Sequence, residues 1–246
     1  MLNNCNWIIP NWPAPANVRA LTTTREQGAS DTPFHYFNLA LHVADDPNTV
    51  LKNRENLKRA ASLPSDPFWL TQVHGTTVVN VADWHPPYPS IEADASVAFA
   101  PNQVCAVLTA DCLPILLCNQ SGTCVSAVHA GWRGIAAGVI EQAVLKLPTN
   151  PESLLAWLGP AIGPTAFEVK EDVLAVFPDS QAFSPAGKGS WFANIYQLAI
   201  ERLYQLGVSK IFGGGFCTYS DSMRFYSFRR SKITGRMASL IWIVAP

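Results

Sequence analysis

Short apolar runs separated by turn residues dominate the middle of the chain. Runs at Val104–Leu108, Pro114–Cys118 and Val125–Val128 are each bounded by polar or glycine residues. Apolar runs of this length are typical of strands that are buried on both faces. The pattern therefore predicts neighbouring buried strands, followed by a helix that begins near Trp132.

Apolar residues recur at helical spacing in other stretches. Asp46 and Pro47 suit the N-cap and the first position of a helix that continues to about residue 61. Further helices are predicted at 135–147, 169–177 and 195–206, the last ending at Gly207. Arg54 on the first of these helices is expected to be a surface or interhelical anchor.

The remaining pattern predicts additional strands and two long loops. The strands are Val18–Thr22, Trp69–Val79, Leu154–Leu158, Lys210–Phe212 and Met237–Val244, and the loops are 83–96 and 213–236. Strands and helices are mixed, and hairpin-like strand pairs are common. The expected class is therefore α/β (α+β), with mixed β-sheets in a sandwich flanked by helices. Without a linker or a repeat, residues 1–246 are expected to form a single domain.

Composition fits a large apolar core and a reducing compartment. Hydrophobic residues make up 48% of the chain and charged residues 14%. The 17 basic and 18 acidic residues give no excess charge that would favour nucleic acid or an acidic membrane surface. Apolar runs stop short of the ~20 residues that span a bilayer. Without a recognisable secretory signal, the six cysteines indicate a reduced, cytoplasmic protein, expected to be a monomer.

Three residues with metal-binding side chains lie in or beside predicted strands. Cys112 follows the first buried run, His129 follows the third, and His74 falls within 69–79. Zinc accepts imidazole nitrogen and thiolate sulfur, and three protein ligands would leave a fourth position open, as in catalytic sites. The chain has no CxxC or HxxxH spacing. From the residues alone, packed or hydrogen-bonded Cys and His side chains are therefore the favoured interpretation, and a zinc site is the alternative.

Polar residues beside these candidates suggest further roles. Asp111 could serve as an acid or base, could orient a ligand, or could cap a turn. Arg133 at the start of a predicted helix could bind an anion together with the free N–H groups there, or could form a salt bridge. Arg25 and Asn38 could face a ligand, or could simply anchor a loop.

A basic cluster near the C-terminus has two interpretations as well. It contains Arg229, Arg230, Lys232 and Arg236. Such a cluster could hold an anion, but it is also typical of a solvated loop.

Several short motifs give the chain a resemblance to the YfiH family. They are TQVHG (71–75), ADAS (93–96), TADCLP (109–114), HAGWRG (129–134), WLGPAIGP (157–164), CTY (217–219) and GRMASLIW (235–242). Elements TR, FNLALHV, DDP and NR within 23–54 are similar too, so the match is nearly full length. EQGAS at 26–30 departs locally, with one glycine where relatives often have a pair.

The resemblance implies a function and a site. The family, formerly named for multicopper polyphenol oxidase or laccase, is described as purine nucleoside phosphorylases with adenosine deaminase and methylthioadenosine phosphorylase activity, and one bacterial member as a peptidoglycan editing factor. It implies an α/β sandwich similar to cysteine-hydrolase-like proteins, and a zinc site at His74, Cys112 and His129. The implied partners are phosphate and a small-molecule nucleoside: adenosine, inosine, guanosine or methylthioadenosine.

On this reading we expect two further sets of site residues. The catalytic set is Cys112, Asp111 and Arg133, and the substrate-binding set is Arg25, Asn38 and Arg229. Copper could also bind at the triad, because divalent copper binds most N/S sites tightly.

Three other activities are weighed against this reading. A copper laccase mechanism is disfavoured because the five histidines form no HxH pair and no methionine is spaced as an axial ligand. A peptidoglycan-precursor editing amidase, acting on a substrate of the UDP-MurNAc-L-Ser type, would use Cys112 or the metal at an amide carbonyl. A non-catalytic zinc-binding protein would have four protein ligands and no open position.

Overall fold

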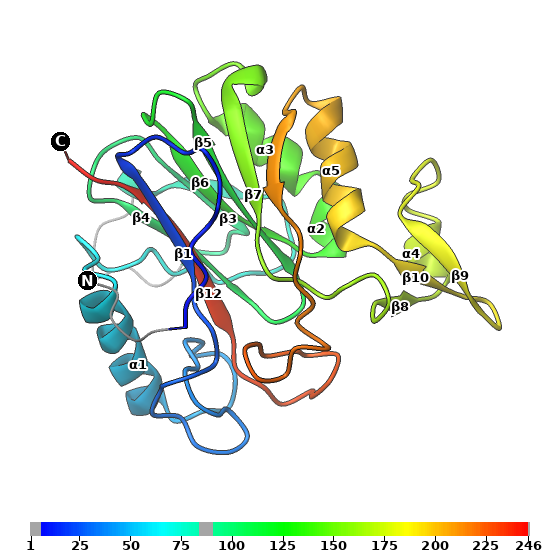
Figure 1. Ribbon diagram of the computed structural model, residues 1–246, viewed down its shortest axis with the longest axis horizontal. Coiled ribbons are helices and arrows are strands. Elements are labelled where there is room, and N and C mark those ends of the chain that lie inside the picture. The colour runs from blue at the N-terminus through cyan, green and yellow to red at the C-terminus, as the bar shows by residue number, and fades with distance from the viewer. Residues whose placement is uncertain (1–5, 84–90, 246) are drawn as a thin grey trace.

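A six-stranded mixed sheet forms the centre of the protein, as the computed structural model shows for residues 6–83 and 91–245 (Figure 1). Its strand order is β11–β7–β5–β6–β3–β2. These strands are β2 (Val78–Asn80), β3 (Ala95–Ala98), β5 (Leu113–Asn119), β6 (Val125–Ala130), β7 (Leu154–Leu158) and β11 (Lys210–Gly213). Strand β5 is antiparallel to both β6 and β7, whereas the outer pairs β11–β7 and β2–β3 are parallel.

A smaller antiparallel sheet covers one face of the central sheet. It consists of β1 (Val18–Thr22), β12 (Met237–Ile243) and β4 (Val104–Thr109), in the order β1–β12–β4. Leu116 of β5 packs toward this sheet with Val107 and Ile241, and Ile115 packs on the opposite face. Since successive side chains of a strand alternate between its faces, β5 needs apolar residues at every position.

Helices close both outer sides of the two sheets (Figure 1). Helices α2 (Trp132–Ala137), α3 (Val139–Lys146) and α5 (Ile195–Gln205) cover the free face of the central sheet. Helix α1 (Pro47–Ala60) covers the small sheet, where Leu57 packs with Ala106 and Leu240. The layers are therefore helix, sheet, sheet and helix, which confirms the predicted mixed α/β sandwich.

A third, small sheet projects from the body beside α5 (Figure 1). It contains β8 (Glu168–Val169), β9 (Phe183–Gly187) and β10 (Ser190–Ala193), with the short helix α4 (Glu171–Leu174) between β8 and β9. Single 3-10 turns lie at Val81–Asp83 and Pro151–Ser153.

Most predicted elements are confirmed with small changes at their ends. Asp46 caps α1 through the amide of Thr49, with Pro47 at the helix start. Arg54 of this helix donates to the Leu39 carbonyl and stacks on Trp69, as an anchor between elements. Burial of its guanidinium lowers the pKa of Arg54 to about 10.

Three predicted elements are wrong in detail. The stretch 69–79 is mainly an irregular loop with a turn at His74, and only its last residues enter β2. The helix predicted at 135–147 is interrupted at Gly138, whose φ of 99° ends α2 before α3 begins. The stretch 169–177 contains the end of β8 and the four-residue α4 instead of a longer helix.

The expected loop 83–96 is only partly described. Strand β3 begins at Ala95, so the last two residues of the expected loop belong to a strand, and residues 84–90, including His85, lie outside the described part.

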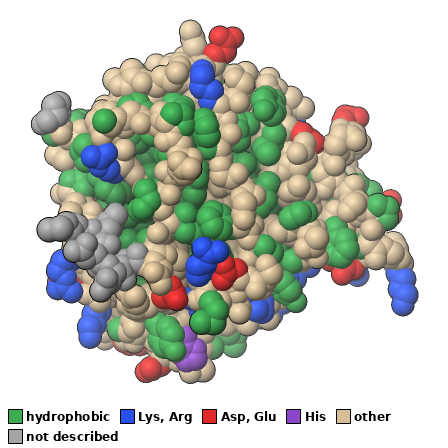
Figure 2. Space-filling model, in the orientation of Figure 1, with side chains coloured by type: hydrophobic (Ala, Val, Ile, Leu, Met, Phe, Trp, Pro, Cys, Tyr) green, Lys and Arg blue, Asp and Glu red, His purple; other side chains and the backbone are tan. Residues whose placement is uncertain are grey.

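Charged side chains are scattered over the face of the protein shown in Figure 2. On this face the Lys, Arg, Asp and Glu side chains of the described residues form no single large patch of either sign. In residues 6–83 and 91–245, none of the helices combines the length and apolarity required to traverse a bilayer.

Candidate metal centre

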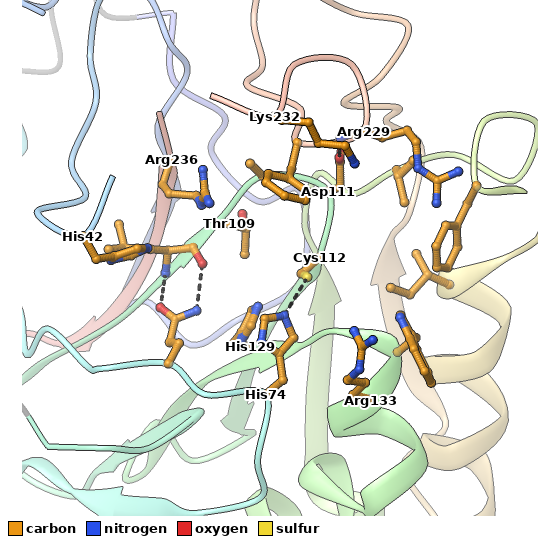
Figure 3. Close-up of a pocket in the computed structure, with 18 residues that line it drawn as sticks. His42, His74, Thr109, Asp111, Cys112, His129, Arg133, Arg229, Lys232 and Arg236 are labelled. Atoms are coloured by element: carbon orange, nitrogen blue, oxygen red, sulfur yellow. Dashed lines mark hydrogen bonds between the residues drawn. The ribbon is translucent and has the colours of Figure 1, made fainter. Parts of the chain in front are cut away.

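Two strand ends and one turn bring His74, Cys112 and His129 together (Figure 3). His129 lies near the end of β6, and Cys112 directly precedes β5, whose Leu113 pairs with Ala130. The antiparallel register therefore places Cys112 beside the end of β6. One ligand atom from each of the three residues lies within 4.8 Å of the others. Among the described residues, this is the one cluster of His, Cys, Asp or Glu that could hold a metal ion.

Backbone turns aim these side chains at a common point. His74 has a φ of 59° and Asp111, just before Cys112, a φ of 89°, both in the left-handed region that few non-glycine residues adopt. Cys112 Sγ lies 3.7 Å from His74 Nε2, and the rings of His74 and His129 are 4.8 Å apart at their centroids. The turns thus present the thiol and both imidazoles to one small volume.

Gly131 allows this close approach. A Cβ atom at this position would lie 2.9 Å from His74 Cδ2 and 3.1 Å from Cys112 Sγ. Its own backbone conformation is ordinary, so the requirement for glycine is one of space.

Asp94 is the buried carboxylate that holds the site together. Its Oδ1 lies 2.7 Å from His129 Nδ1, and the carboxylate also accepts hydrogen bonds from the amides of Val73, His74 and Gly75. Engaging Nδ1 leaves Nε2 of His129 free to face Cys112. A carboxylate behind a histidine in this way fixes the ring and strengthens it as a ligand. Sequence reasoning quoted Asp94 only as part of the ADAS motif.

The electrostatics of the triad favour a thiolate. Burial would raise the pKa of the Cys112 thiol, but the neighbouring His129 and His74 outweigh burial and lower that pKa. Burial would lower the pKa of His129, but Cys112 and Asp94 together raise it. A thiolate with two imidazoles is a donor set that suits zinc or another borderline divalent ion.

The triad opens into a cavity of about 390 Å³ with an excess of positive charge. The cations in its wall are Arg133, Arg229, Lys232 and Arg236. Among the described residues, Asp111 is the single carboxylate in the wall, and none of the four cationic side chains forms an ion pair with a carboxylate. An anion is the ligand that would balance this wall.

The predicted catalytic residues all lie in the cavity wall, but their surroundings differ. Arg133 is exposed, with its guanidinium 4.3 Å from the Trp132 ring centroid. Its helix α2 has six residues, so anion binding there would depend on the guanidinium more than on a helix dipole. Asp111 accepts a hydrogen bond on each oxygen, from Thr218 Oγ1 at 2.6 Å and from the Arg229 amide at 2.6 Å.

The predicted substrate-binding residues fall in different places. Arg229 lines the cavity, and its side chain bonds the Glu168 carbonyl. Arg25 does not line it, because its guanidinium donates to the carbonyls of His35 and Ser222. Asn38 is fully buried and also lies outside the cavity wall.

Sequence reasoning did not single out several residues of the cavity wall, among them His42, Gln72, Thr109 and Phe228. Gln72 spans the Leu108 backbone with two hydrogen bonds of 2.8 and 2.7 Å. Gln72 and Thr109 belong to the motifs TQVHG and TADCLP, so the motifs could have indicated that these two residues lie near the site. His42 belongs to the similar element FNLALHV in the same way, whereas Phe228 lies in an irregular segment outside the quoted motifs.

Comparison with known proteins places the chain among relatives of similar length. The sequence model of the family described as "Multi-copper polyphenol oxidoreductase laccase" matches residues 19–244. "Purine nucleoside phosphorylase YfiH" of Escherichia coli (strain K12) is 50% identical over 242 residues, which cover 96% of this chain and 98% of that protein. "Purine nucleoside phosphorylase PA4543" of Pseudomonas aeruginosa is 52% identical over 243 residues, with the same coverage of 96% and 98%.

Solved structures agree with the fold. The crystal structure of Neisseria meningitidis protein NMB0706 matches with a TM-score of 0.93 and 43% identity, covering 98% of this chain and 100% of that one. YlmD from Geobacillus stearothermophilus matches with a TM-score of 0.90 and 27% identity, covering 97% and 96%.

Proposed function

The chain belongs to the YfiH family, whose sequence model carries the multi-copper laccase description, and from this premise we propose that it is a zinc-dependent purine nucleoside phosphorylase. One observation carries the proposal: three residues that could hold a metal ion form the floor of a cavity with an unbalanced cationic wall. Relatives about half identical to the chain carry the phosphorylase name.

His74, Cys112 and His129 would hold the ion, and bound zinc would supply a Lewis acid at the floor of the cavity. Their donor types fit zinc, and three protein ligands leave a position facing the cavity. Asp94 keeps the His129 ring in place for this purpose. The cavity volume of about 390 Å³ falls in the range of small-molecule sites.

Phosphorolysis exchanges one bond for another at the ribose. A phosphate oxygen forms a bond to C1′ while the C1′–N9 bond breaks, and the electron pair leaves with the purine, which takes up a proton. Arg133 would hold the phosphate, since its guanidinium is stacked on Trp132 and faces no carboxylate among the described residues. Asp111 is the candidate for delivering the proton, as the carboxylate of the described wall.

Phosphate-dependent release of purine from adenosine and inosine tests the proposal. Wild-type protein loaded with zinc should release base only when phosphate is present. Arg133→Ala should raise the Michaelis constant for phosphate roughly tenfold, because a charged hydrogen bond is lost. Arg59→Ala, an arginine of α1 that bonds Asn56, is the matched control. An unchanged Michaelis constant in Arg133→Ala would remove Arg133 from the phosphate site.

The identity of the metal and the older laccase description are tested together. Metal analysis of the purified protein should give about one zinc per chain, since the described residues form one cluster. Copper bound at the same three ligands would be a substitute for zinc and not a trinuclear oxidase centre. Oxidation of a diphenol by the copper-loaded protein at a rate comparable with purine release would contradict this assignment.

Adenosine deaminase activity is a finer part of the proposal. Water would add to C6 of adenosine and ammonia would leave, so a proton donor near the metal is needed. Asp111 is again the candidate. Formation of inosine from adenosine without phosphate would support this activity, and Asp111→Asn should slow it.

A peptidoglycan-precursor editing amidase and a non-catalytic zinc-binding protein are the competing functions. Assays of nucleosides and of a UDP-linked muropeptide, run side by side, separate the phosphorylase from an editing amidase. A non-catalytic protein would lose stability without zinc and would turn over neither substrate.

A further inference from the structure

A second group of polar side chains in the cavity wall lies away from Arg133. Figure 3 shows Arg236, Thr109 and Lys232 above the metal triad, while Arg133 lies to the right of it on α2. The proposed function gives a role to Arg133 and leaves these three residues without one. Thr109 ends β4, whereas Lys232 and Arg236 lie in the loop before β12, so the fold brings two distant segments together here.

Distances and strand register place these residues near one another. Lys232 Nζ lies 4.5 Å from the centroid of the Phe228 ring, and Arg236 Cζ lies 5.9 Å from the same centroid. Thr109 pairs with Met237 across the β4–β12 ladder. Arg236 directly precedes Met237, so its backbone lies close to Thr109. Two cations thus lie beside one aromatic ring at this end of the cavity, and Thr109 lies in the same part of the wall.

The Thr109 hydroxyl points to a missing ligand. Thr109 is 1% exposed and lines the cavity, yet its Oγ1 has no hydrogen-bond partner among the described residues. A buried hydroxyl without a partner costs free energy, which a ligand oxygen in the cavity would recover. Of the five buried unpaired side-chain atoms in the described part, Thr109 Oγ1 is the one that belongs to the cavity wall.

Arg236 is anchored in a way that leaves donors free. Its Nη1 bonds the carbonyls of Thr234 and Gly235, and its backbone amide is held by the buried Asn38 side chain. No hydrogen bond from its Nε or Nη2 to another described residue is present, so these donors are available to a ligand. A fixed guanidinium with free N–H groups matches the planar, forked recognition of a phosphate.

We propose that Thr109, Lys232 and Arg236 form an oxyanion subsite for a phosphate group, distinct from the position assigned to Arg133. The hydroxyl donates to one phosphate oxygen, and the ammonium and guanidinium neutralise the charge. Two sources of that group share this chemistry: free inorganic phosphate, or a phosphate carried by the nucleoside substrate. The inference rests on the proposed function only where it relates the bound phosphate to phosphorolysis. Phosphate binding itself is inferred from the side chains of the cavity wall.

Direct binding of inorganic phosphate to the zinc-loaded full chain, measured by calorimetry without nucleoside, is the first arm of the test. Thr109→Val and Lys232→Met should each weaken this binding roughly tenfold if free phosphate is the occupant. Thr24→Val is the matched control, because Thr24 Oγ1 is also buried and unpaired but lies outside the cavity wall. Lys146→Met controls for loss of an exposed lysine.

Binding of inosine 5′-monophosphate to the same variants is the second arm. If the phosphate is carried by the substrate, Thr109→Val and Lys232→Met weaken this ligand roughly tenfold and leave inosine and inorganic phosphate unchanged. Either pattern supports the subsite and identifies its source. Unchanged binding of both phosphate compounds in both variants overturns it.

The two arms also separate this inference from the proposed function. A wild-type protein that binds phosphate through Thr109 and Lys232 but releases no purine would contradict the phosphorylase and leave the subsite standing. The opposite result would support the phosphorylase and contradict the subsite. In that case purine release depends on phosphate, but neither variant changes the Michaelis constant for phosphate or the binding measured in the two arms.

Discussion

The metal end and the cationic end of the cavity are built in different ways. At the metal end, His129 is buried, and Asp94 behind it is fully buried and fixes both the ring and the turn that carries His74. At the cationic end, Lys232 is exposed on a loop and contacts the half-exposed ring of Phe228. Thr109 is held there by its strand, and the Arg236 amide is held by the buried Asn38 side chain.

This difference matches two kinds of ligand: a metal ion depends on exact geometry, and an anion depends mainly on charge. A metal ion requires ligand atoms within tenths of an ångström of their ideal distances, so its supports must be buried and rigid. An anion held by cations in partly solvated surroundings tolerates small displacements, because the attraction changes slowly with distance. Substitutions at the metal end should therefore abolish function, whereas those at the cationic end should grade affinity.

The largest effect is expected from Cys112→Ala. This variant loses the sulfur ligand and should lose its bound ion, with purine release falling roughly a thousandfold because the Lewis acid is gone. Atomic emission after dialysis measures the metal, and base release measures activity. Cys217→Ala is the control, since Cys217 is a partly exposed thiol outside the cavity wall. Full metal content in Cys112→Ala would contradict the three-ligand site.

Asp94→Asn tests the buried support without touching a ligand. The amide cannot match a carboxylate that accepts from His129 and three backbone N–H groups, so metal affinity should fall about 10- to 100-fold. Competition with a chelator measures the affinity. Glu201→Gln is the control, because Glu201 also accepts several hydrogen bonds, from Ser180, Gln181 and Gln197, but lies outside the cavity. Equal metal affinities of the two variants would mean that Asp94 does not support the site.

The comparison also explains how much could be predicted from the sequence. Strands β4, β5 and β6 were predictable because burial on both faces demands continuous apolar runs. The meeting of Cys112 and His129 follows from the β5–β6 pairing, which a hairpin-like pattern suggests.

The turn at His74 was not predictable from local pattern. Its conformation is supported by Asp94, twenty positions further along the chain, and nothing in the residues around His74 reveals this contact. The break at Gly138 was hidden for another reason. Ile135 of α2 and Val139 of α3 face the same core, so the apolar stripe continues across the break.

Polar residues in loops were the hardest to assign. Asn38 resembles a ligand-facing amide in the sequence. In the structure its side chain is fully engaged in hydrogen bonds to Ala40, Asp45 and the Arg236 amide. Arg25 is likewise consumed by backbone carbonyls. Such long-range backbone bonds leave no periodic signal, so these two assignments and the catalytic roles of Asp111 and Arg133 remain predictions.

Gly131→Ala should have an intermediate effect by crowding the metal end. The added methyl group would meet His74 Cδ2 at 2.9 Å, so the imidazole must move and metal affinity should fall about tenfold. Gly215→Ala is the control, because a Cβ atom there meets nothing within 4 Å. A crystal structure of the zinc-loaded variant would show the displaced ring. Unchanged metal affinity would show that the turn at His74 is more adaptable than the hydrogen bonds to Asp94 indicate.

The smallest effect concerns His42, which senses the charge of the cationic end. Burial and the positive charges of Arg236, Arg54 and His129 lower its pKa from the ordinary 6.5. As the pH falls through that ordinary value, the unfolded chain takes up a proton that the folded protein resists, so His42 contributes a loss of stability toward acid pH. Arg236→Gln removes one positive charge that disfavours protonation of His42, so the pKa of His42 should rise toward 6.5. Arg59→Gln should leave this pKa unchanged. NMR titration of the His42 ring measures the midpoint. Equal midpoints in the wild type and Arg236→Gln would show that solvent screens the charge of Arg236 from His42.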